Sequence, residues 1–206
     1  MFSRLTEFLR GKITMNLAYA HRFDAEEYLA FEEARTGSKH EYFQGEIYAM
    51  VGARDAQVTA AGNLFALLWN RLRGTPCRIY MADMKLRVEA ADAFFYPDVF
   101  VTCDARDQAN PHYKAYPRLV VEVLSDSTAS FDRGRKFATY RLLDTLREYV
   151  LIDPDSLTVE VFRRGDHADW AFHAYSGTDT LTLASIDCQI ELTALFENVH
   201  PGSVPR

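Results

Sequence analysis

Two carboxylates lie within apolar, β-branched runs of this chain, and a lysine follows the second of them. Asp98 belongs to the run 96–101, Glu122 belongs to the run 119–125, and Lys136 comes after a short polar turn. Carboxylates at the ends of two neighbouring strands can hold a hard divalent cation. A lysine beside them can orient a water molecule or stabilise charge during phosphoryl transfer. The pattern therefore indicates metal-assisted chemistry on a phosphodiester.

Each of these residues also has an ordinary structural interpretation. Asp98 fits the solvated end of a strand, where charged side chains are common. Glu122 interrupts a run typical of a strand buried on both faces, so its carboxylate requires either a cation or an ion pair with Arg or Lys. Asp132 and Lys136 have the spacing of a surface i,i+4 pair. Both kinds of interpretation stay open on spacing alone.

A helix is predicted over residues 131–143, directly after the Glu122 strand and its polar turn. Four side chains recur at four-residue steps and therefore share one face of this segment: Thr128, Asp132, Lys136 and Tyr140. Because the turn is short, we expect this face to look back over Glu122. Lys136 can then reach the space between the two carboxylates.

The rest of the pattern predicts a single layered fold. Helices are predicted at residues 23–33, 55–73 and 191–196. Strands are predicted at residues 41–50 (a hairpin with a Gln44-Gly45 turn), 77–81, 85–89, 95–102, 119–124, 147–152, 158–163, 171–175 and 180–183. Residues 103–117 are predicted to form a polar loop. This order indicates an α/β (α+β mixed) fold, a mixed β-sheet flanked by helices.

Length and composition agree with one folded domain. The chain has 206 residues, of which 48% are hydrophobic and 25% charged, so a substantial core can form. We expect a flexible N-terminal extension at residues 1–20, one domain at residues 21–200 and a frayed tail at residues 201–206. No apolar run has the length of a membrane span, and no secretory signal is recognisable. The formal net charge of -6 argues against a general nucleic-acid coat protein.

The three cysteines carry a further expectation. Cys77, Cys103 and Cys188 are scattered and form no Cys-x-x-Cys pattern. We therefore expect neither zinc ligation nor a disulfide framework, and this usage is typical of a reducing cytoplasm.

An ordered series of short motifs resembles a known family. The motifs lie at residues 42–50, 62–64, 96–99, 121–128, 132–140 and 148–153. Together they resemble the Uma-two (Uma2) family of restriction-endonuclease-like proteins, a branch of the PD-(D/E)XK nuclease superfamily. The resemblance covers about residues 23–196. It implies a restriction-endonuclease-like core, an activity on nucleic acid, most often DNA, and a bacterial source.

The resemblance also implies roles for individual residues. Asp98, Glu122 and the backbone carbonyl of Val123 would hold Mg²⁺, with Mn²⁺ as a substitute. Glu46 matches the family's N-terminal acid and would be a further ligand or a water-positioning group. The superfamily lysine falls at Leu124 here, so the lysine would come from the following helix as Lys136. Replacing Lys136 with Ala would then lower turnover and leave folding intact. A plain edge-strand glutamate is the ordinary alternative for Glu46.

Partner expectations come from the same source. Arg133, Arg135 and Arg141 would contact the nucleic-acid backbone, and we expect a homodimer because nuclease folds that cut both strands usually pair. Family members often carry Ser and His where this chain has Arg54 and Gln57. A catalytically weak or inactive module that binds nucleic acid or a protein is therefore the second functional hypothesis.

A third functional hypothesis is a structural or dimerisation protein. It would use aromatic side chains of the C-terminal hairpin as an interface: Phe162, Trp170, Phe172 and Tyr175.

Overall fold

A computed structural model gives the fold, and it describes residues 22–35, 37–50, 52–167 and 169–202. The predicted extension at residues 1–20 and most of the predicted tail, residues 203–206, lie outside the described residues. Within the described residues, no helix is long and apolar enough to cross a membrane.

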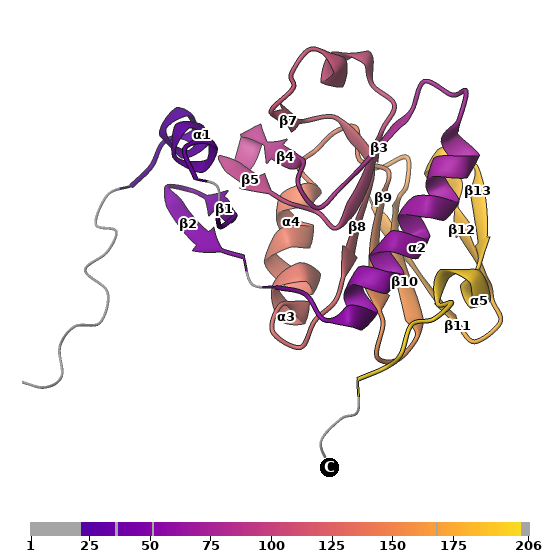
Figure 1. Cartoon of the computed structure of the whole chain (residues 1–206). Coiled ribbons are helices and arrows are strands. Elements are labelled where there is room, and N and C mark those ends of the chain that lie inside the picture. The colour runs from indigo at the N-terminus through magenta and orange to yellow at the C-terminus, as the bar shows by residue number, and fades with distance from the viewer. Residues whose placement is uncertain (1–21, 36, 51, 168, 203–206) are drawn as a thin grey trace, which may run out of the picture.

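A six-stranded mixed sheet forms the centre of the molecule (Figure 1). Its strands lie in the order β11-β10-β9-β8-β6-β3, and only β8 and β9 run parallel. Their bounds are β3 Arg78–Met81, β6 Val99–Thr102, β8 Pro117–Val123, β9 Glu148–Asp153, β10 Thr158–Arg164 and β11 Trp170–Ser176. The predicted mixed sheet flanked by helices is thereby confirmed.

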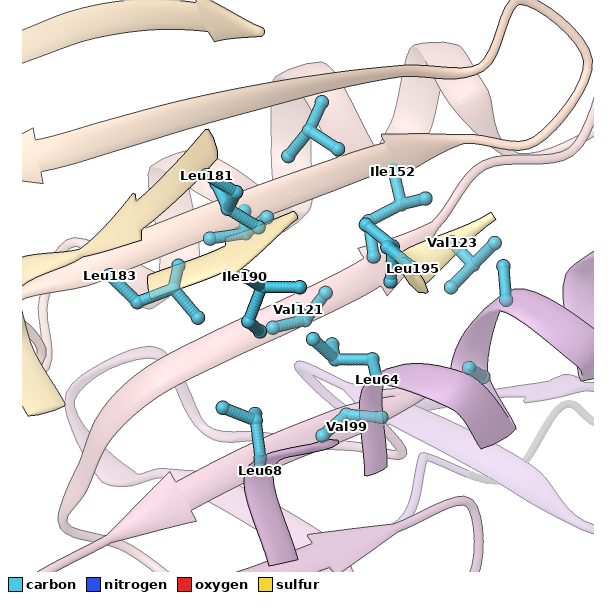
Figure 2. Close-up of a cluster of buried hydrophobic side chains, with 14 of the residues drawn as sticks. Leu64, Leu68, Val99, Val121, Val123, Ile152, Leu181, Leu183, Ile190 and Leu195 are labelled. Atoms are coloured by element: carbon cyan, nitrogen blue, oxygen red, sulfur yellow. The ribbon is translucent and has the colours of Figure 1, made fainter. Parts of the chain in front are cut away.

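The two faces of this sheet bury different layers. Successive side chains of a strand point to opposite faces, so Val121 and Val123 pack under α2 (Asp55–Leu72), where Leu64 and Leu68 meet them (Figure 2). The hairpin of β12 (Thr180–Leu183) and β13 (Cys188–Glu191) and the short α5 (Leu192–Leu195) complete this core. The fully apolar character of this layer makes it the main stabilising core of the domain.

The opposite face of the sheet is covered by one irregular helical segment. It consists of α3 (Ala129–Phe131), a π-helical turn η3 (Asp132–Lys136) and α4 (Phe137–Tyr140). Val120 and Leu124 of the β8 region pack against this cover together with Tyr140. Glu122 lies between them in sequence and therefore points to the same face. A carboxylate thus replaces an apolar side chain in the middle of a buried row.

A smaller five-stranded sheet adjoins this helical side (Figure 1). Its order is β2-β1-β5-β4-β7, and α1 (Ala25–Glu33) packs beside it through Tyr28, which contacts Tyr42 and Phe94. Its strands are β1 His40–Phe43, β2 Glu46–Ala49, β4 Lys85–Val88, β5 Ala93–Phe95 and β7 Tyr113–Lys114. Three short 3-10 helices complete the fold: η1 Glu89–Ala91, η2 Ala105–Gln108 and η4 Ala184–Ile186.

Short sequence patterns predicted most of the helices and strands correctly. The predicted helix at residues 55–73 is α2, and Asp24 caps α1 by accepting hydrogen bonds from the backbone N–H groups of Glu26 and Glu27. The predicted hairpin is β1 and β2, joined by Gln44 and Gly45 with positive φ angles of 49° and 89°. Such a two-residue turn matches the twist of the flanking strands. Strand β13 was not predicted, and neither was the short β7 within the predicted polar loop.

The strand predicted over residues 95–102 is divided. Its first part, β5, belongs to the small sheet, and its second part, β6, belongs to the central sheet. The break falls at Tyr96-Pro97-Asp98, because Pro97 has no N–H to donate to a ladder. The chain crosses from one sheet to the other at this point, and Asp98 stands at the junction.

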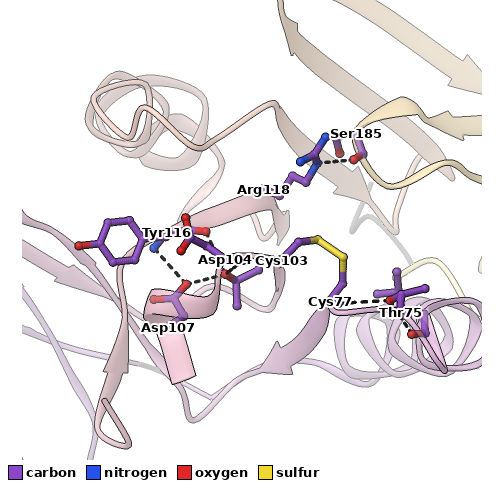
Figure 3. The surroundings of a disulfide bond; sticks show 10 residues. Thr75, Cys77, Cys103, Asp104, Asp107, Tyr116, Arg118 and Ser185 are labelled. Carbon is purple, nitrogen blue, oxygen red and sulfur yellow. Dashed lines mark hydrogen bonds between the residues drawn. A yellow bond between two sulfur atoms is a disulfide. The ribbon is translucent and has the colours of Figure 1, made fainter. Parts of the chain in front are cut away.

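The cysteine prediction is wrong for two of the three residues. Cys77 and Cys103 form a disulfide, whereas Cys188 is a buried free thiol (Figure 3). The register of β3 and β6 pairs Arg78 with Thr102, so the next residue outward on each strand meets its counterpart. This proximity depends on strand pairing and cannot be read from the spacing of cysteines in the sequence.

The disulfide should contribute to stability by closing a loop. The two cysteines are 26 residues apart, and the chain-entropy relation gives about 3–4 kcal/mol for a loop of this size. We expect the Cys77→Ser/Cys103→Ser protein to lose this amount of unfolding free energy in urea denaturation under oxidising conditions. With excess dithiothreitol, the parent and the variant should unfold at the same urea concentration. An unfolding midpoint of the parent that does not change with dithiothreitol would contradict the prediction.

Candidate active site

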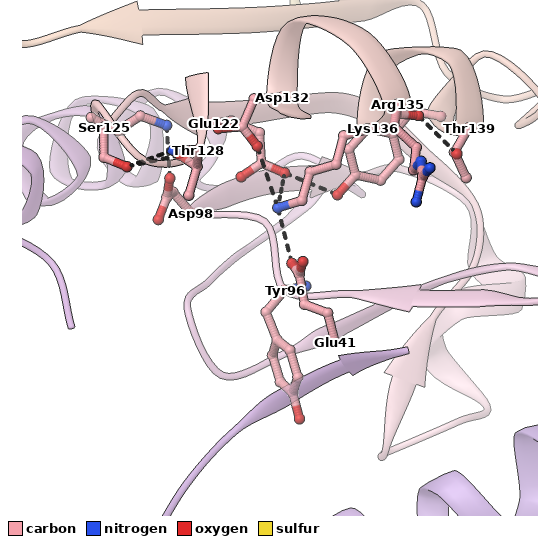
Figure 4. Close-up of polar contacts among 12 residues, drawn as sticks. Glu41, Tyr96, Asp98, Glu122, Ser125, Thr128, Asp132, Arg135, Lys136 and Thr139 are labelled. Atoms are coloured by element: carbon pink, nitrogen blue, oxygen red, sulfur yellow. Dashed lines mark hydrogen bonds and ion pairs between the residues drawn. The ribbon is translucent and has the colours of Figure 1, made fainter. Parts of the chain in front are cut away.

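Asp98 and Glu122 are brought together by the pairing of β6 with β8. The register joins Val99 to Val121 and Phe100 to Val120, and one further step places Asp98 opposite Glu122. Residues that face each other across an antiparallel pair lie on the same side of the sheet. Both carboxylates line the same cavity: Glu122 faces Lys136 of η3, and Asp98 faces the backbone of β8 (Figure 4).

The side chain of Asp98 also takes the place of a backbone hydrogen bond that is missing between β6 and β8. Its Oδ2 accepts a hydrogen bond of 2.7 Å from the backbone N–H of Val123, at the position where the break at Pro97 interrupts pairing. The next amide, Leu124 N–H, donates instead to Ile152 on the other side of β8. The N–H and C=O groups of one residue in an extended strand point the same way. The carbonyl of Val123 is therefore directed to the Asp98 side.

Lys136 lies among the acids (Figure 4). Its Nζ is 3.2 Å from Oε1 of Glu122, 2.9 Å from Oε1 of Glu41 and 3.6 Å from Oδ1 of Asp132. Tyr140 donates a further hydrogen bond of 3.0 Å to Oε1 of Glu122. The face predicted from four-residue spacing thus turns toward Glu122. The i,i+4 pair with Asp132 exists, but it is buried rather than on the surface.

Glu41 comes from the small sheet. It lies on β1, and its Oε1 accepts a hydrogen bond of 3.2 Å from the backbone N–H of Tyr96, next to the break between β5 and β6. The same oxygen contacts Lys136. This carboxylate joins the strand junction to the helical cover, so both sheets contribute to the site.

Burial and crowding of like charges act on both the acids and the lysine. Desolvation raises the pKa of Glu122 well above its ordinary value, although the charge of Lys136 opposes this. Desolvation also raises the pKa of Asp98, against the hydrogen bond from Val123. Burial lowers the pKa of Lys136, but the charges of Glu122, Glu41 and Asp132 outweigh it and the net pKa is raised. The lysine therefore stays protonated at neutral pH.

The acids line an open cavity of about 410 Å³. Five carboxylates and two cationic side chains face it: Glu41, Asp98, Glu122, Asp126 and Asp132, with Arg54 and Lys136. Arg54 is already paired with Asp155 outside the cavity. The cavity thus carries an excess of negative charge. An anionic substrate would be repelled unless a cation is bound there as well.

The donors fit a hard divalent ion that keeps part of its water shell. In the described residues, no group of three or more Asp, Glu, His or Cys side chains is close enough to hold a metal ion unaided. Mg²⁺, however, is usually bound by one or two carboxylates with waters and substrate oxygens completing the shell. Asp98, Glu122 and the Val123 carbonyl supply that number of oxygens. Oδ1 of Asp132 is a buried oxygen without a hydrogen-bond partner, and the ammonium of Lys136 lies 3.6 Å from it.

Glu46 lies apart from this cluster. It is exposed at the start of β2, does not line the cavity, and its Oε2 accepts a hydrogen bond of 2.5 Å from the hydroxyl of Tyr48. Glu41, on the other strand of the same hairpin, lines the cavity instead.

The three predicted backbone-binding arginines have different surroundings. The guanidinium of Arg135 lies 5.3 Å from the ring of Phe43, on the hairpin side of the site. Arg133 forms an ion pair with Glu160 on β10, and Arg141 lies 5.2 Å from the ring of Phe137. The structure therefore places only Arg135 beside the hairpin that borders the cavity.

Comparison with known proteins shows the family of this chain. A family model described as Uma2, "Putative restriction endonuclease", matches residues 25–194. The chain belongs to the Uma2 family. The Synechocystis protein slr1290 is 37% identical over 178 residues, which are 86% of this chain and 93% of that protein. A second Synechocystis protein, sll1609, is 36% identical over 148 residues, which are 71% and 83% of the two chains.

The fold of this Uma2 protein is also that of a solved structure. A chain from Anabaena variabilis, described as a "putative nuclease belonging to DUF820", superposes with a TM-score of 0.68. The match covers 84% of this chain and 97% of the other at 16% sequence identity. At that identity the likeness concerns the fold alone. It confirms the mixed architecture predicted from the sequence.

Arg54 and Gln57, the departures from the Uma2 pattern, have clear structural positions. Gln57 is buried at the start of α2, where its Oε1 accepts a hydrogen bond of 2.7 Å from Arg54 N–H and its Nε2 donates one of 3.0 Å to the carbonyl of Leu124. It thus fastens the end of β8, two residues after Glu122, to the helix. Arg54 lies on the cavity rim and pairs with Asp155. Both side chains line the cavity and make defined contacts there.

Sequence reasoning missed three acids of the cavity, Glu41, Asp126 and Asp132. Asp132 carried a usable signal, since it shares the predicted helix face with Lys136, but a surface pair explained it equally well. Glu41 carried none, because its distance from Lys136 depends on how the small sheet lies against the helical cover.

Proposed function

We propose that this Uma2 protein is a metal-dependent endonuclease that hydrolyses phosphodiester bonds of DNA. One observation carries the proposal: Asp98 and Glu122 face each other across β6 and β8 with the ammonium of Lys136 beside them, in a cavity with excess negative charge. Membership in a family described as "Putative restriction endonuclease" supports the same reaction. The homodimer stays a prediction from the resemblance.

The residues that would hold Mg²⁺ are Asp98, Glu122 and the carbonyl of Val123. A cation held there would neutralise charge on the phosphate and lower the pKa of a bound water. The hydrogen bond from Val123 N–H fixes one oxygen of Asp98, and Tyr140 and Lys136 fix Glu122. The ligands are therefore preorganised before any cation arrives.

Lys136 would orient groups rather than remove a proton. Because its raised pKa keeps it protonated, its ammonium can donate hydrogen bonds but cannot act as a general base. Glu41, Glu122 and Asp132 hold the ammonium at one point of the cavity wall. A donor fixed in this way can align the attacking water or stabilise charge that develops on the phosphoryl oxygens.

The test measures both metal binding and DNA cleavage. Calorimetry should show Mn²⁺ binding to the parent chain, with a large loss of affinity in Asp98→Asn and in Glu122→Gln. The parent should nick plasmid DNA in Mg²⁺ or Mn²⁺ and lose this activity in EDTA. A parent that binds no Mn²⁺, even with a DNA duplex present, would contradict the proposal and favour the non-catalytic module with Glu122 as an ion-paired core residue.

A further inference from the structure

A second hollow adjoins the cavity of the proposed active site. It has a volume of about 720 Å³ and lies between the end of α1 and the turn after β3. The two hollows share five lining residues: Met50, Gly52, Ala53, Tyr96 and Asp98. They therefore form one continuous trough, and Asp98 lies where its two halves meet.

The second half of the trough carries cationic and acidic side chains in equal number. Arg35, Lys39 and Lys85 line it together with Glu32, Asp83 and Asp98. Lys39 pairs with Asp83, but the two side chains are 45% and 80% exposed, and exposed pairs contribute little free energy. Lys39 can thus exchange this carboxylate for a phosphate of a ligand. The second half of the trough is therefore less negative than the first, and its three cations are available to the phosphates of a ligand.

The wall of the first half is apolar where it opens to solvent. Tyr48 and Met50 line it and are 41% and 39% exposed. Among the described residues only six large apolar side chains are exposed to this degree, and these two are neighbours at the end of β2. β2 is an edge strand. An apolar pair at the mouth of a strongly polar cavity indicates a ligand with a flat, weakly polar part.

The ring of Tyr48 is held in place. Its hydroxyl donates a hydrogen bond of 2.5 Å to Oε2 of Glu46, and the positive charge of Arg135 acts on the same hydroxyl. Glu46 is thereby a positioning residue for Tyr48, which accounts for an acid of the motif that does not reach the cavity.

We propose that the trough binds a single, unpaired strand of DNA. Tyr48 and Met50 would contact the face of one base, and Lys39, Arg35 and Lys85 would contact the phosphates beyond Asp98. This inference rests on the proposed nuclease function and names its substrate. Single-strand binding commonly combines a base stacked on an aromatic side chain with contacts from cationic side chains to the phosphates. In a duplex the base faces are covered by their neighbours, so these side chains would have nothing to contact.

Fluorescence anisotropy tests the proposal. The probe is a short labelled mixed-sequence DNA strand, alone or annealed to its complement, and the protein is the full chain with Asp98→Asn to prevent cleavage. We expect the single strand to bind at least about tenfold more tightly than the duplex. Adding Tyr48→Ala should weaken single-strand binding about fivefold or more and leave duplex binding unchanged.

Two further variants make the result specific. Tyr48→Trp keeps a stacking surface and should retain the affinity of the parent. Phe172→Ala removes an exposed aromatic ring from β11, remote from the trough lining, and should have no effect. Equal binding of duplex and single strand, or an unchanged affinity in Tyr48→Ala, would overturn the proposal.

Cleavage by the parent chain separates this inference from the proposed function. Cleavage of the duplex but not of the single strand would refute the trough assignment and support the nuclease. Tyr48-dependent binding of the single strand without cleavage of either form in Mn²⁺ would support the trough and refute the nuclease.

Discussion

Asp98→Asn and Glu122→Gln are each expected to lower the rate of DNA cleavage by about 10³-fold. Each amide keeps the shape of the acid and one acceptor oxygen. The amide at position 98 would still accept from Val123 N–H, and the amide at position 122 would still accept from Lys136 and Tyr140. What disappears is an anionic oxygen for a divalent cation. The loss should therefore concern cleavage and Mn²⁺ affinity, not folding.

The control for this prediction is Asp187→Asn. Asp187 is an exposed acid that pairs with Arg71 and takes no part in the cavity lining, and its left-handed φ of 49° is compatible with Asn. This variant should cleave DNA like the parent. Urea unfolding should show that the two site variants are folded. Full cleavage by Asp98→Asn would remove this residue from the proposed metal site.

Lys136→Met is expected to lower both cleavage and stability. Loss of a preorganised donor should cost about 10²–10³-fold in rate. The sequence alone predicted that a Lys136 variant would fold normally, but the ammonium lies among three carboxylates and the side chain is 8% exposed. Removing one partner of a buried ion pair leaves uncompensated charge and costs about 3–5 kcal/mol. Urea denaturation without metal measures this loss.

A double variant separates the two effects. In Lys136→Met/Glu122→Gln, one of the carboxylates left without its cation becomes a neutral amide. We expect part of the lost unfolding free energy to return, whereas cleavage stays absent. If Lys136→Met were as stable as the parent and the second substitution changed nothing, the ion-pair account of the cluster would be wrong.

The fold could be predicted to the extent that short-range signals determine it. The capping by Asp24, the apolar stripe of α2 and the Gln44-Gly45 turn each act within a few residues, and the structure contains the elements they predict. The prediction of one strand over residues 95–102 was wrong. The segment is mostly apolar throughout, but the chain passes from one sheet to the other at Pro97. Pro97 was a local signal for a break, but it does not reveal that the two parts pair with different sheets.

The candidate site divides in the same way. The proximity of Glu122 and Lys136 followed from a short connection between a strand and a helix. Glu41 and the Cys77–Cys103 bond depend on pairings between distant segments, which a single sequence does not reveal. The π-helical turn at Asp132–Lys136 is a further example, since the four-residue spacing predicted an unbroken helix. Such turns are frequent at functional sites.

The break at Pro97 makes the amide of Val123 an internal reporter of the site. Most strand amides bond to a neighbouring carbonyl, but this one bonds to the carboxylate of Asp98. The chemical shift of its proton therefore depends directly on the charge and position of Asp98, a proposed metal ligand. In an NMR spectrum of the ¹⁵N-labelled protein, the amide resonance of Val123 would report changes at Asp98, and no chemical probe would have to be attached.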